Sequence, residues 1–531
     1  MGARRACTVV RMSDVRTSAV VSVSEGRLGG SIVDGVHVFL GVPYAAPPFG
    51  ANRLRPPQPV DSWSGVRDAT ELGPEPPQVA PPATGGSALG PAEDWDDVGE
   101  AFARVKRVAA AHDCLNLNIW TPDTGATRLP VMVWIQGGMF ELSSTAAYDG
   151  SRFARDGVVC VVINWRPGAE GFLYLSDGIA NVGLLDQVAA LEWVRENIAG
   201  FGGDPGNVTI FGESAGAMSI GVLLAMPRAD GLFRRAILQS GAAHHVTPAA
   251  DARRIAEYLA EKLSVPATRD AIASVGVERL LAAQAELKAE LLANPDPDRW
   301  GKAAVATTMP WQPVIDGDIV PEPPIERITA GSSSQVDVIV GTNCDDWRLW
   351  IVVSGVIAQI TDEILTGPVK AYGYQSLSAY GLPVGRALAA YRARYPAATP
   401  GDLLAAVQTD WWMRVPAIRL ADAHAKTAAG TYMYEFAWPS PGLGAVHALE
   451  VPFVFDTAST DAPLFGPLLG ERPPQELADV MHAAWVSFAR DGDPGWPRYE
   501  LGTRVTMRFD LTSQVVEDPR SWERGLWSGI R

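Results

Sequence analysis

Five apolar runs, each of a length suited to a buried strand, alternate with helix-like segments, and this alternation constrains the fold more than any other feature. The runs are "LPVMVWIQ" (129–136), "GVVCVVINW" (157–165), "NVTIFGE" (207–213), "FRRAILQSG" (233–241) and "QVDVIVGTN" (335–343). Between the second and third lies "GLLDQVAALEWVRENIAGFGG", which has apolar residues at helical spacing and a glycine stop. Because strand–helix–strand order requires right-handed crossovers, we expect an α/β fold whose mostly parallel sheet is covered on both faces.

A serine flanked by glycines lies where the third run ends. The sequence "GESAG" at 212–216 follows the expected strand and opens an apolar, helix-like run. Gly212 and Gly216 would allow a tight, strained turn that lifts the Ser214 hydroxyl above the sheet at a helix N-terminus, which is the context of a nucleophile elbow. The motif alone also fits a serine that caps a helix. The strand before it and the helix after it favour the nucleophile.

A serine nucleophile needs a histidine base and an orienting carboxylate, which in folds of this kind follow in the order serine, acid, histidine. Three histidines leave room for an acid between them and the serine: His424, His447 and His482. His424 and His482 lie in helix-patterned segments, whereas His447 lies in a glycine-bearing loop before an apolar run. We therefore expect His447 to be the base.

The candidate acid and the candidate oxyanion hole each follow a strand. Asp345 and Asp346 come directly after "QVDVIVGTN", and either could orient the base. After "VMVWIQ", Gly137 and Gly138 would let backbone N–H groups approach a substrate oxygen, because no Cβ is in the way. A further donor is the N–H of Ala215, the residue after the expected nucleophile.

The chain resembles the type B carboxylesterases, a family that includes para-nitrobenzyl esterases, mammalian carboxylesterases, cholinesterases and the non-catalytic neuroligins. The resemblance runs from about residue 20 to about residue 510 and is most specific in the block 181–217. Other matching stretches are "FLGVPYAAPPFGANRLRPP", "DCLNLNIWTP", "NWRPGAEGFL", "FRRAILQSGAA", "PVIDGDIVPEPP", "HALEVPFVF" and "WVSFARDGDPGWPRY". It implies an α/β-hydrolase fold with large helical insertions, and serine esterase chemistry that needs no metal or cofactor.

The resemblance also implies roles for individual residues. The nucleophile, acid and base of the family fall on Ser214, Asp346 and His447. The oxyanion donors fall on the backbone N–H groups of Gly138, Met139 and Ala215, and possible supporting residues are Glu213, Gly137 and Gln136.

The chain departs from the family pattern within the expected site. The family acid is usually Glu, and Asp is one methylene shorter, so Asp345 remains an alternative to Asp346. In the oxyanion loop, "QGGMF", Gln136 replaces a frequent His and Met139 replaces a third Gly or Ala.

Two further departures are structural. The cysteine that pairs with Cys114 in secreted relatives corresponds to Pro76, so that disulfide cannot form. The family has an acidic residue at the position of His112, where it is expected to pair with Arg53. Histidine at this position removes that ion pair.

The charge and the cysteines limit the partners and the compartment. A net charge of −16 argues against a nucleic-acid or anionic-membrane partner, because both need clustered Lys and Arg. No segment approaches the roughly 20 apolar residues of a membrane span. Four cysteines in 531 residues give neither a disulfide framework nor a CxxC metal pair, so we expect cytoplasmic residence. The sequence does not determine the oligomeric state.

The domain organisation follows from the N-terminal residues and from the resemblance. Residues 1–18 are expected to be a disordered extension, with Met12 as an alternative start, and 19–531 a single α/β-hydrolase domain. Helical insertions are expected at about 242–330 and 351–440. The tryptophans expected to wall the substrate pocket are Trp300, Trp311, Trp347, Trp350, Trp411 and Trp412.

We expect the substrate to be a neutral, partly apolar carboxylic ester, hydrolysed through an acyl-enzyme on Ser214. An acyl transferase, a lactone-forming cyclase or a thioesterase could use the same three residues, because only the second acceptor differs. A non-catalytic binding relative is less expected, since the serine, the acid and the histidine are all retained.

Overall fold

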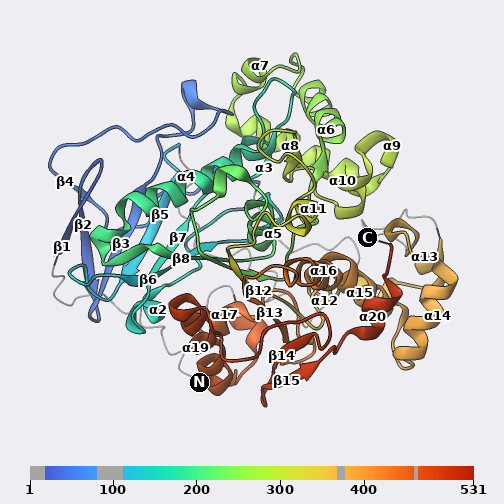
Figure 1. The fold of residues 1–531 in the computed structure, drawn as a ribbon. Coiled ribbons are helices and arrows are strands. Elements are labelled where there is room, and N and C mark those ends of the chain that lie inside the picture. The colour runs from blue at the N-terminus through green and yellow to red at the C-terminus, as the bar shows by residue number, and fades with distance from the viewer. Residues whose placement is uncertain (1–17, 80–111, 368–376, 460–464, 531) are drawn as a thin grey trace, which may run out of the picture.

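The structure is a computed structural model that describes residues 18–79, 112–367, 377–459 and 465–530 (Figure 1). Within these residues, one 13-stranded sheet has the order β1-β2-β3-β5-β7-β6-β8-β9-β12-β13-β14-β15, and β4 pairs with β2. Of the expected N-terminal extension, only Ser18 is described, and it begins β1. The rest lies outside the described residues.

The centre of the sheet is parallel. Its strands are β6 (Leu129–Ile135), β7 (Val159–Ile163), β8 (Gly203–Glu213), β9 (Arg235–Gln239), β12 (Asp337–Asn343), β13 (Thr431–Phe436) and β14 (Val505–Phe509). The five strands expected from the sequence are all present here. Most of their residues are buried on both faces, which is why they read as continuous apolar runs.

The edges of the sheet are mainly antiparallel. On one side lie β1 (Ser18–Val23), β2 (Gly26–Val33), β3 (Val36–Pro43), β4 (Val66–Asp68) and β5 (Asn116–Thr121), and on the other β15 (Gln514–Glu517). In β1, buried and exposed residues alternate, as expected for a strand with one solvated face. A separate two-stranded sheet pairs β10 (Thr247–Pro248) with β11 (Val314–Ile315).

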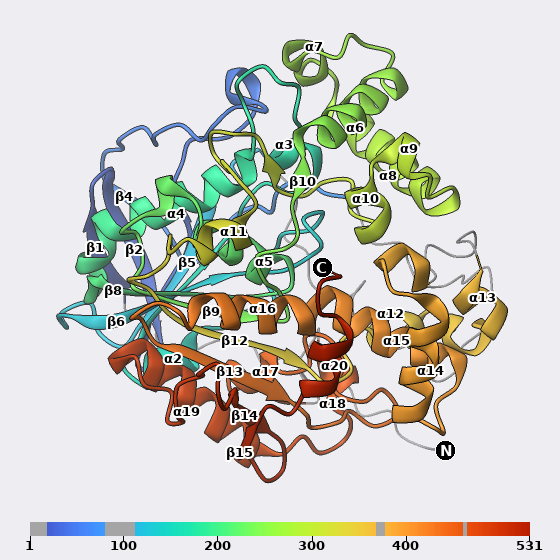
Figure 2. The same cartoon turned by 45° about the vertical axis from the view of Figure 1, so that its right-hand side comes forward.

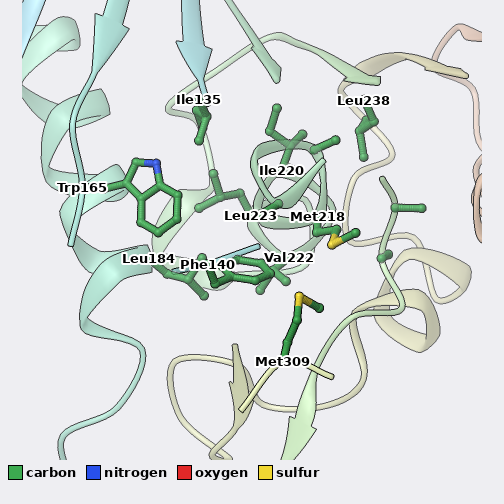
Figure 3. Packing of buried hydrophobic residues seen from close by; sticks show 14 of the residues in the cluster. Ile135, Phe140, Trp165, Leu184, Met218, Ile220, Val222, Leu223, Leu238 and Met309 are labelled. Carbon is green, nitrogen blue, oxygen red and sulfur yellow. The ribbon is translucent and has the colours of Figure 1, made fainter. Parts of the chain in front are cut away.

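Helices cover both faces of the sheet (Figures 1 and 2). One face carries α4 (Val182–Asn197), α5 (Ala215–Leu223), α11 (Pro324–Thr329) and α16 (Val415–His424), and the other α2 (Ser151–Arg155), α17 (Val451–Val454) and α19 (Gln475–Asp491). All nine residues of α5 are buried. In Figure 3, Ile220 and Leu223 of this helix lie close to Ile135 of β6, which fixes the helix that follows the glycine-flanked serine.

Two groups of helices begin at the carboxyl ends of parallel strands and lie on the same side of the molecule (Figure 1). After β9 come α6 (Ala249–Lys262), α7 (Arg269–Ala273), α8 (Val277–Ala293), α9 (Pro297–Trp300) and α10 (Lys302–Thr307). After β12 come α12 (Arg348–Val353), α13 (Asp362–Thr366), α14 (Val384–Arg394), α15 (Pro400–Thr409) and a π-helix at Asp410–Arg414. The range 351–440 expected for the second insertion is too long, because it contains β13, a strand of the central sheet.

Three short helices complete the described elements used below: α3 (Gly168–Phe172), α18 (Gly466–Leu469) and α20 (Ser521–Leu526). Throughout the described ranges, we find no helix with the length and apolar character needed to cross a bilayer.

Candidate active site

The site is built at the carboxyl edge of the parallel strands, where ligands bind in sheets of this kind. Ser214 follows β8, and Gly137 and Gly138 follow β6. Asp346 follows β12, and His447 lies in the segment after β13. Because the parallel strands end at one edge, residues as far apart in the chain as Glu213 and His447 meet there.

Ser214 occupies the turn between β8 and α5 with φ 56° and ψ −126°, a conformation that residues with a Cβ rarely adopt. The turn therefore has the strained strand-to-helix geometry of a nucleophile elbow. A Cβ at either Gly212 or Gly216 would collide with the carbonyl oxygen of Ile135 in β6. The two glycines thus permit close approach of the elbow to the neighbouring strand.

The loop after β6 packs directly on this turn. A Cβ on Gly137 would lie 2.8 Å from the Cβ of Ser214. Met139 and Phe140 are both left-handed, with φ 55° and 59°. Such conformations cost roughly 1–2 kcal/mol per residue, so the surrounding structure must hold the loop.

Two contacts hold this loop. The ring of Phe140 is buried, and its centroid lies 5.2 Å from that of Phe172. The backbone carbonyl of Phe140 accepts a hydrogen bond of 2.7 Å from the N–H of Gly168. Gln136 is buried, and its Nε2 donates to Ser143 Oγ at 2.7 Å. Gln136 thereby ties the start of the loop to the segment that follows it.

The three expected oxyanion donors belong to these two adjoining turns. Gly138, with φ 130°, and Met139 lie in the loop after β6. Ala215 is the first residue of α5, so its N–H has no acceptor within the helix. Their assignment as an oxyanion hole stays a prediction.

His447 and Asp346 are in direct contact. The Nδ1 of His447 lies 2.8 Å from Oδ1 of Asp346, and both side chains are buried. The other carboxylate oxygen of Asp346 accepts hydrogen bonds from Ser240 Oγ at 3.1 Å and from the N–H of Asn343 at 3.0 Å. An aspartate therefore reaches the histidine here despite being one methylene shorter than glutamate.

Asp345 points elsewhere. Its Oδ2 accepts a hydrogen bond of 3.0 Å from the N–H of Ala445, and its own N–H donates to the carbonyl of Ala445 at 2.9 Å. Asp345 therefore joins two loops, whereas Asp346 contacts the expected base.

The second ring nitrogen of His447 faces Glu213. Its Nε2 lies 2.8 Å from Glu213 Oε1, an ion-pair distance, yet the geometry is not that of an aligned hydrogen bond. Among the described residues, Nε2 has no hydrogen-bond partner, Ser214 included. Burial alone would lower the pKa of His447, but the negative charges of Glu213 and Asp346 outweigh burial and raise this pKa to about 10.

A third buried carboxylate, Glu450, was not singled out from the sequence. It accepts hydrogen bonds from Gln239 Nε2 at 3.1 Å and from Asn343 Nδ2 at 2.6 Å. Burial, followed by the charges of Glu213 and Asp346, raises the pKa of Glu450 to about 7. The available signal was its place in "HALE", three residues after His447, just before an apolar run.

Four of the six expected pocket tryptophans lie together beside the base. The ring of Trp350 is 4.6 Å from that of His447 and 4.4 Å from that of Trp347. Trp347 stacks on Trp412 at 4.5 Å, and Trp412 contacts Trp411 at 5.5 Å. Trp300 packs on Tyr258 of α6. Trp300 and Trp311 belong to the same buried apolar cluster as Trp347, Trp411 and Trp412.

The histidines set aside from the sequence make other contacts. His424 Nδ1 lies 2.7 Å from Thr431 Oγ1, and His482 Nε2 lies 3.0 Å from Asp156 Oδ2. Both lie in helices, α16 and α19, as their patterns predicted.

The structural departures have clear outcomes. Cys114 is buried and free. Arg53 has an ion-pair partner elsewhere in the chain: it pairs with Glu170 of α3 in a buried contact of 2.6 Å. His112 stacks on Phe49 instead, with ring centroids 4.6 Å apart.

Comparison with known proteins extends over almost the whole chain. The model of the carboxylesterase family matches residues 17–521. The para-nitrobenzyl esterase of Bacillus subtilis (strain 168) is 34% identical over 523 residues, covering 96% of this chain and 98% of that protein. Carboxylesterase 1D of Mus musculus is 33% identical over 561 residues, covering 96% of this chain and 93% of that protein.

Solved structures agree with the sequence comparisons. The crystal structure of a Geobacillus stearothermophilus carboxylesterase at pH 6.2 superimposes with a TM-score of 0.79 at 36% identity, covering 96% of this chain and 100% of that one. The α/β-hydrolase fold and the resemblance seen in the sequence are both confirmed. The chain belongs to the carboxylesterase family and is a serine esterase that hydrolyses carboxylic esters.

Proposed function

We propose that the enzyme hydrolyses neutral, partly apolar esters through an acyl-enzyme on Ser214, with His447 as general base and Asp346 as the orienting acid. The observation that carries this proposal is the buried 2.8 Å contact between His447 Nδ1 and Asp346 Oδ1 at the edge of the sheet where the Ser214 elbow lies.

The proposed reaction has two halves. Ser214 Oγ attacks the ester carbonyl while His447 Nε2 takes its proton, and this proton then passes to the departing alcohol. Water then attacks the acyl-enzyme: His447 Nε2 takes a proton from the water and passes it to Ser214 Oγ as the acid product leaves. The N–H groups of Gly138, Met139 and Ala215 stabilise the oxyanion in both halves. In this structure Nε2 faces Glu213, whose charge favours the protonated imidazole. The first step therefore requires Nε2 to lose this proton, leave Glu213 and accept a hydrogen bond from Ser214 Oγ.

The charges around the base support a neutral substrate. Glu213 and Asp346 are both buried beside the base, so an anionic ester would meet like charges in a poorly screened environment. The ring of Trp350 beside His447 supplies an apolar surface for an uncharged group.

A serine-directed phosphonate tests the nucleophile. Wild-type enzyme should take up one label, and Ser214→Ala should take up none while kcat for a p-nitrophenyl ester falls by about 10⁶-fold. Ser219→Ala is the matched control, because this buried serine lies in the helix that Ser214 precedes. A full label on Ser214→Ala would refute the assignment. Adding an alcohol as a competing acceptor separates hydrolysis from acyl transfer, because a transferase would form the new ester.

We also propose that residues 19–531 act as one domain in the cytoplasm, with a small-molecule ester as the partner. The 13-stranded sheet supports the first point, because it joins strands from both ends of the described chain. The free thiols of Cys114, Cys160 and Cys344 support a reducing compartment. Cell fractionation that finds the enzyme outside the cytoplasm would contradict this location.

A further inference from the structure

α15, a π-helix at Asp410–Arg414 and α16 follow one another without a break, so that the π-helix is a wider turn within one continuous helical segment. π-Helices are rare, and as single turns within α-helices they occur frequently at functional sites. This one packs against the segment we name the acid loop, residues 344–347, which contains Asp345 and Asp346.

Two side chains from this helix bind the acid loop on either side of its aspartates. Thr409 Oγ1 accepts a hydrogen bond of 3.0 Å from the N–H of Trp347. Arg414 Nη2 donates one of 2.5 Å to the carbonyl of Cys344. Thr409 and Arg414 are both buried, so water does not compete well for either bond.

Arg414 is itself held in place. Its Nη1 pairs with Asp410 one turn away, and Asp410 also accepts a hydrogen bond from the hydroxyl of Tyr391 in α14. The Nε1 of Trp527, just after α20, donates to the same hydroxyl at 2.9 Å. A continuous chain of buried contacts therefore links the C-terminal helix to the backbone of the acid loop.

Two further tryptophan rings connect the π-helix to the base. The ring of Trp412 stacks on Trp347 with an interplanar angle of 25°, and Trp350 lies between Trp347 and the ring of His447. The same five-residue segment thus contacts both ends of the acid loop, and through Trp347 and Trp350 it is connected to the ring of His447.

We propose that Thr409 and Arg414 are positioning residues that fix the acid loop so that Asp346 meets His447, a role that rests on the proposed function. The aspartate side chain explains why the acid loop must be fixed. Because it is one methylene shorter than glutamate, its backbone must lie closer to the imidazole. The N–H of His447 indeed lies 3.2 Å from the carbonyl oxygen of Asp346. A loop held this close tolerates little displacement, because loss of alignment of about 1 Å can cost on the order of 100-fold in rate.

The test replaces Thr409 rather than Arg414, since loss of the arginine would leave Asp410 buried without its ion-pair partner. Thr409→Val keeps the shape but removes the acceptor for Trp347 N–H, and Thr409→Ser keeps the hydroxyl. We expect Thr409→Val to lower kcat by about 10- to 100-fold with little change in KM, and Thr409→Ser to retain most of the activity. The low-pH limb of kcat/KM should also move to lower pH in Thr409→Val, because a displaced Asp346 stabilises the imidazolium less.

Two controls make the outcome decisive. Ile418→Val, a core truncation in α16, should lower Tm without moving the pH limb, which separates positioning from stability. Trp527→Phe, at the far end of the chain of contacts, should shift kcat and the pH limb in the same direction as Thr409→Val but less. Equal kcat and equal pH limbs for Thr409→Val and Thr409→Ser would overturn the proposal. Phosphonate labelling of the wild type at a residue other than Ser214 would instead refute the proposed function.

Discussion

Replacing Asp346 by Asn tests the acid assignment at the level of single atoms. The Oδ2 of Asp346 accepts two hydrogen bonds, from Ser240 Oγ and from the N–H of Asn343. An asparagine satisfies both donors only if its carbonyl oxygen takes this position. Its NH2 group then replaces Oδ1 and faces His447 Nδ1 at the present 2.8 Å.

This orientation forces the wrong tautomer on the base. The NH2 group is a donor, so Nδ1 must become the acceptor and the ring proton moves to Nε2. A histidine protonated at Nε2 cannot accept the serine proton. We therefore expect kcat to fall by about 10⁴-fold, equivalent to about 5.4 kcal/mol of transition-state stabilisation.

Asp345→Asn is the matched control, because it makes the same chemical change at the neighbouring position. The amide oxygen of an asparagine can still accept from Ala445 N–H, so we expect only a small loss of activity. The assay is kcat for p-nitrophenyl acetate at the pH optimum, with active sites counted by phosphonate titration. A larger loss in Asp345→Asn than in Asp346→Asn would refute the reasoning, and equal small losses would mean that another carboxylate orients the base.

Two further predictions concern residues around the reacting centre. Met139→Gly should raise kcat/KM for bulky esters more than for an acetate ester, a difference of roughly 1–3 kcal/mol in transition-state stabilisation, if the Met139 side chain narrows the space around the scissile carbonyl as we propose. The change also relieves the φ of 55°. Uniform loss of activity on small and large esters would show that Met139 only packs the loop. Glu213→Gln should move the low-pH limb of kcat/KM to lower pH, because it removes a negative charge that raises the pKa of His447. A pH profile that stays in place, or moves upward, would contradict the contact between Glu213 and His447 as the cause.

The central strands and the elbow were predictable because their signals are local. A strand buried on both faces is apolar along its whole length, so β6, β7, β8, β9 and β12 are evident from composition alone. The serine motif was likewise interpreted from its local context, a strand before it and a helix after it. The half-buried edge strands and β13 carry weaker patterns, and β13 was placed inside an expected insertion.

The partners of the site residues depend on distant parts of the chain. Nothing local distinguishes Asp345 from Asp346, because both follow the same strand; the segment around Ala445, a hundred residues on, determines which of them contacts His447. The buried ion pair between Arg53 and Glu170 is a similar case, since the two residues are 117 positions apart.

By itself, the sequence determined the α/β class, the strand–turn–helix that contains Ser214, and the choice of His447 as the candidate base, because periodicity, glycine spacing and loop position are properties of short segments. Only the tertiary structure decided which aspartate meets His447, that Glu213 lies against its other nitrogen, and that Glu450 and the π-helix lie nearby. The physical reason is that hydrogen bonds and buried charges act over a few ångströms in space. The strands β6, β8, β9, β12 and β13 lie next to one another in the sheet, so their ends meet at one edge. The local pattern of any one strand does not specify this arrangement.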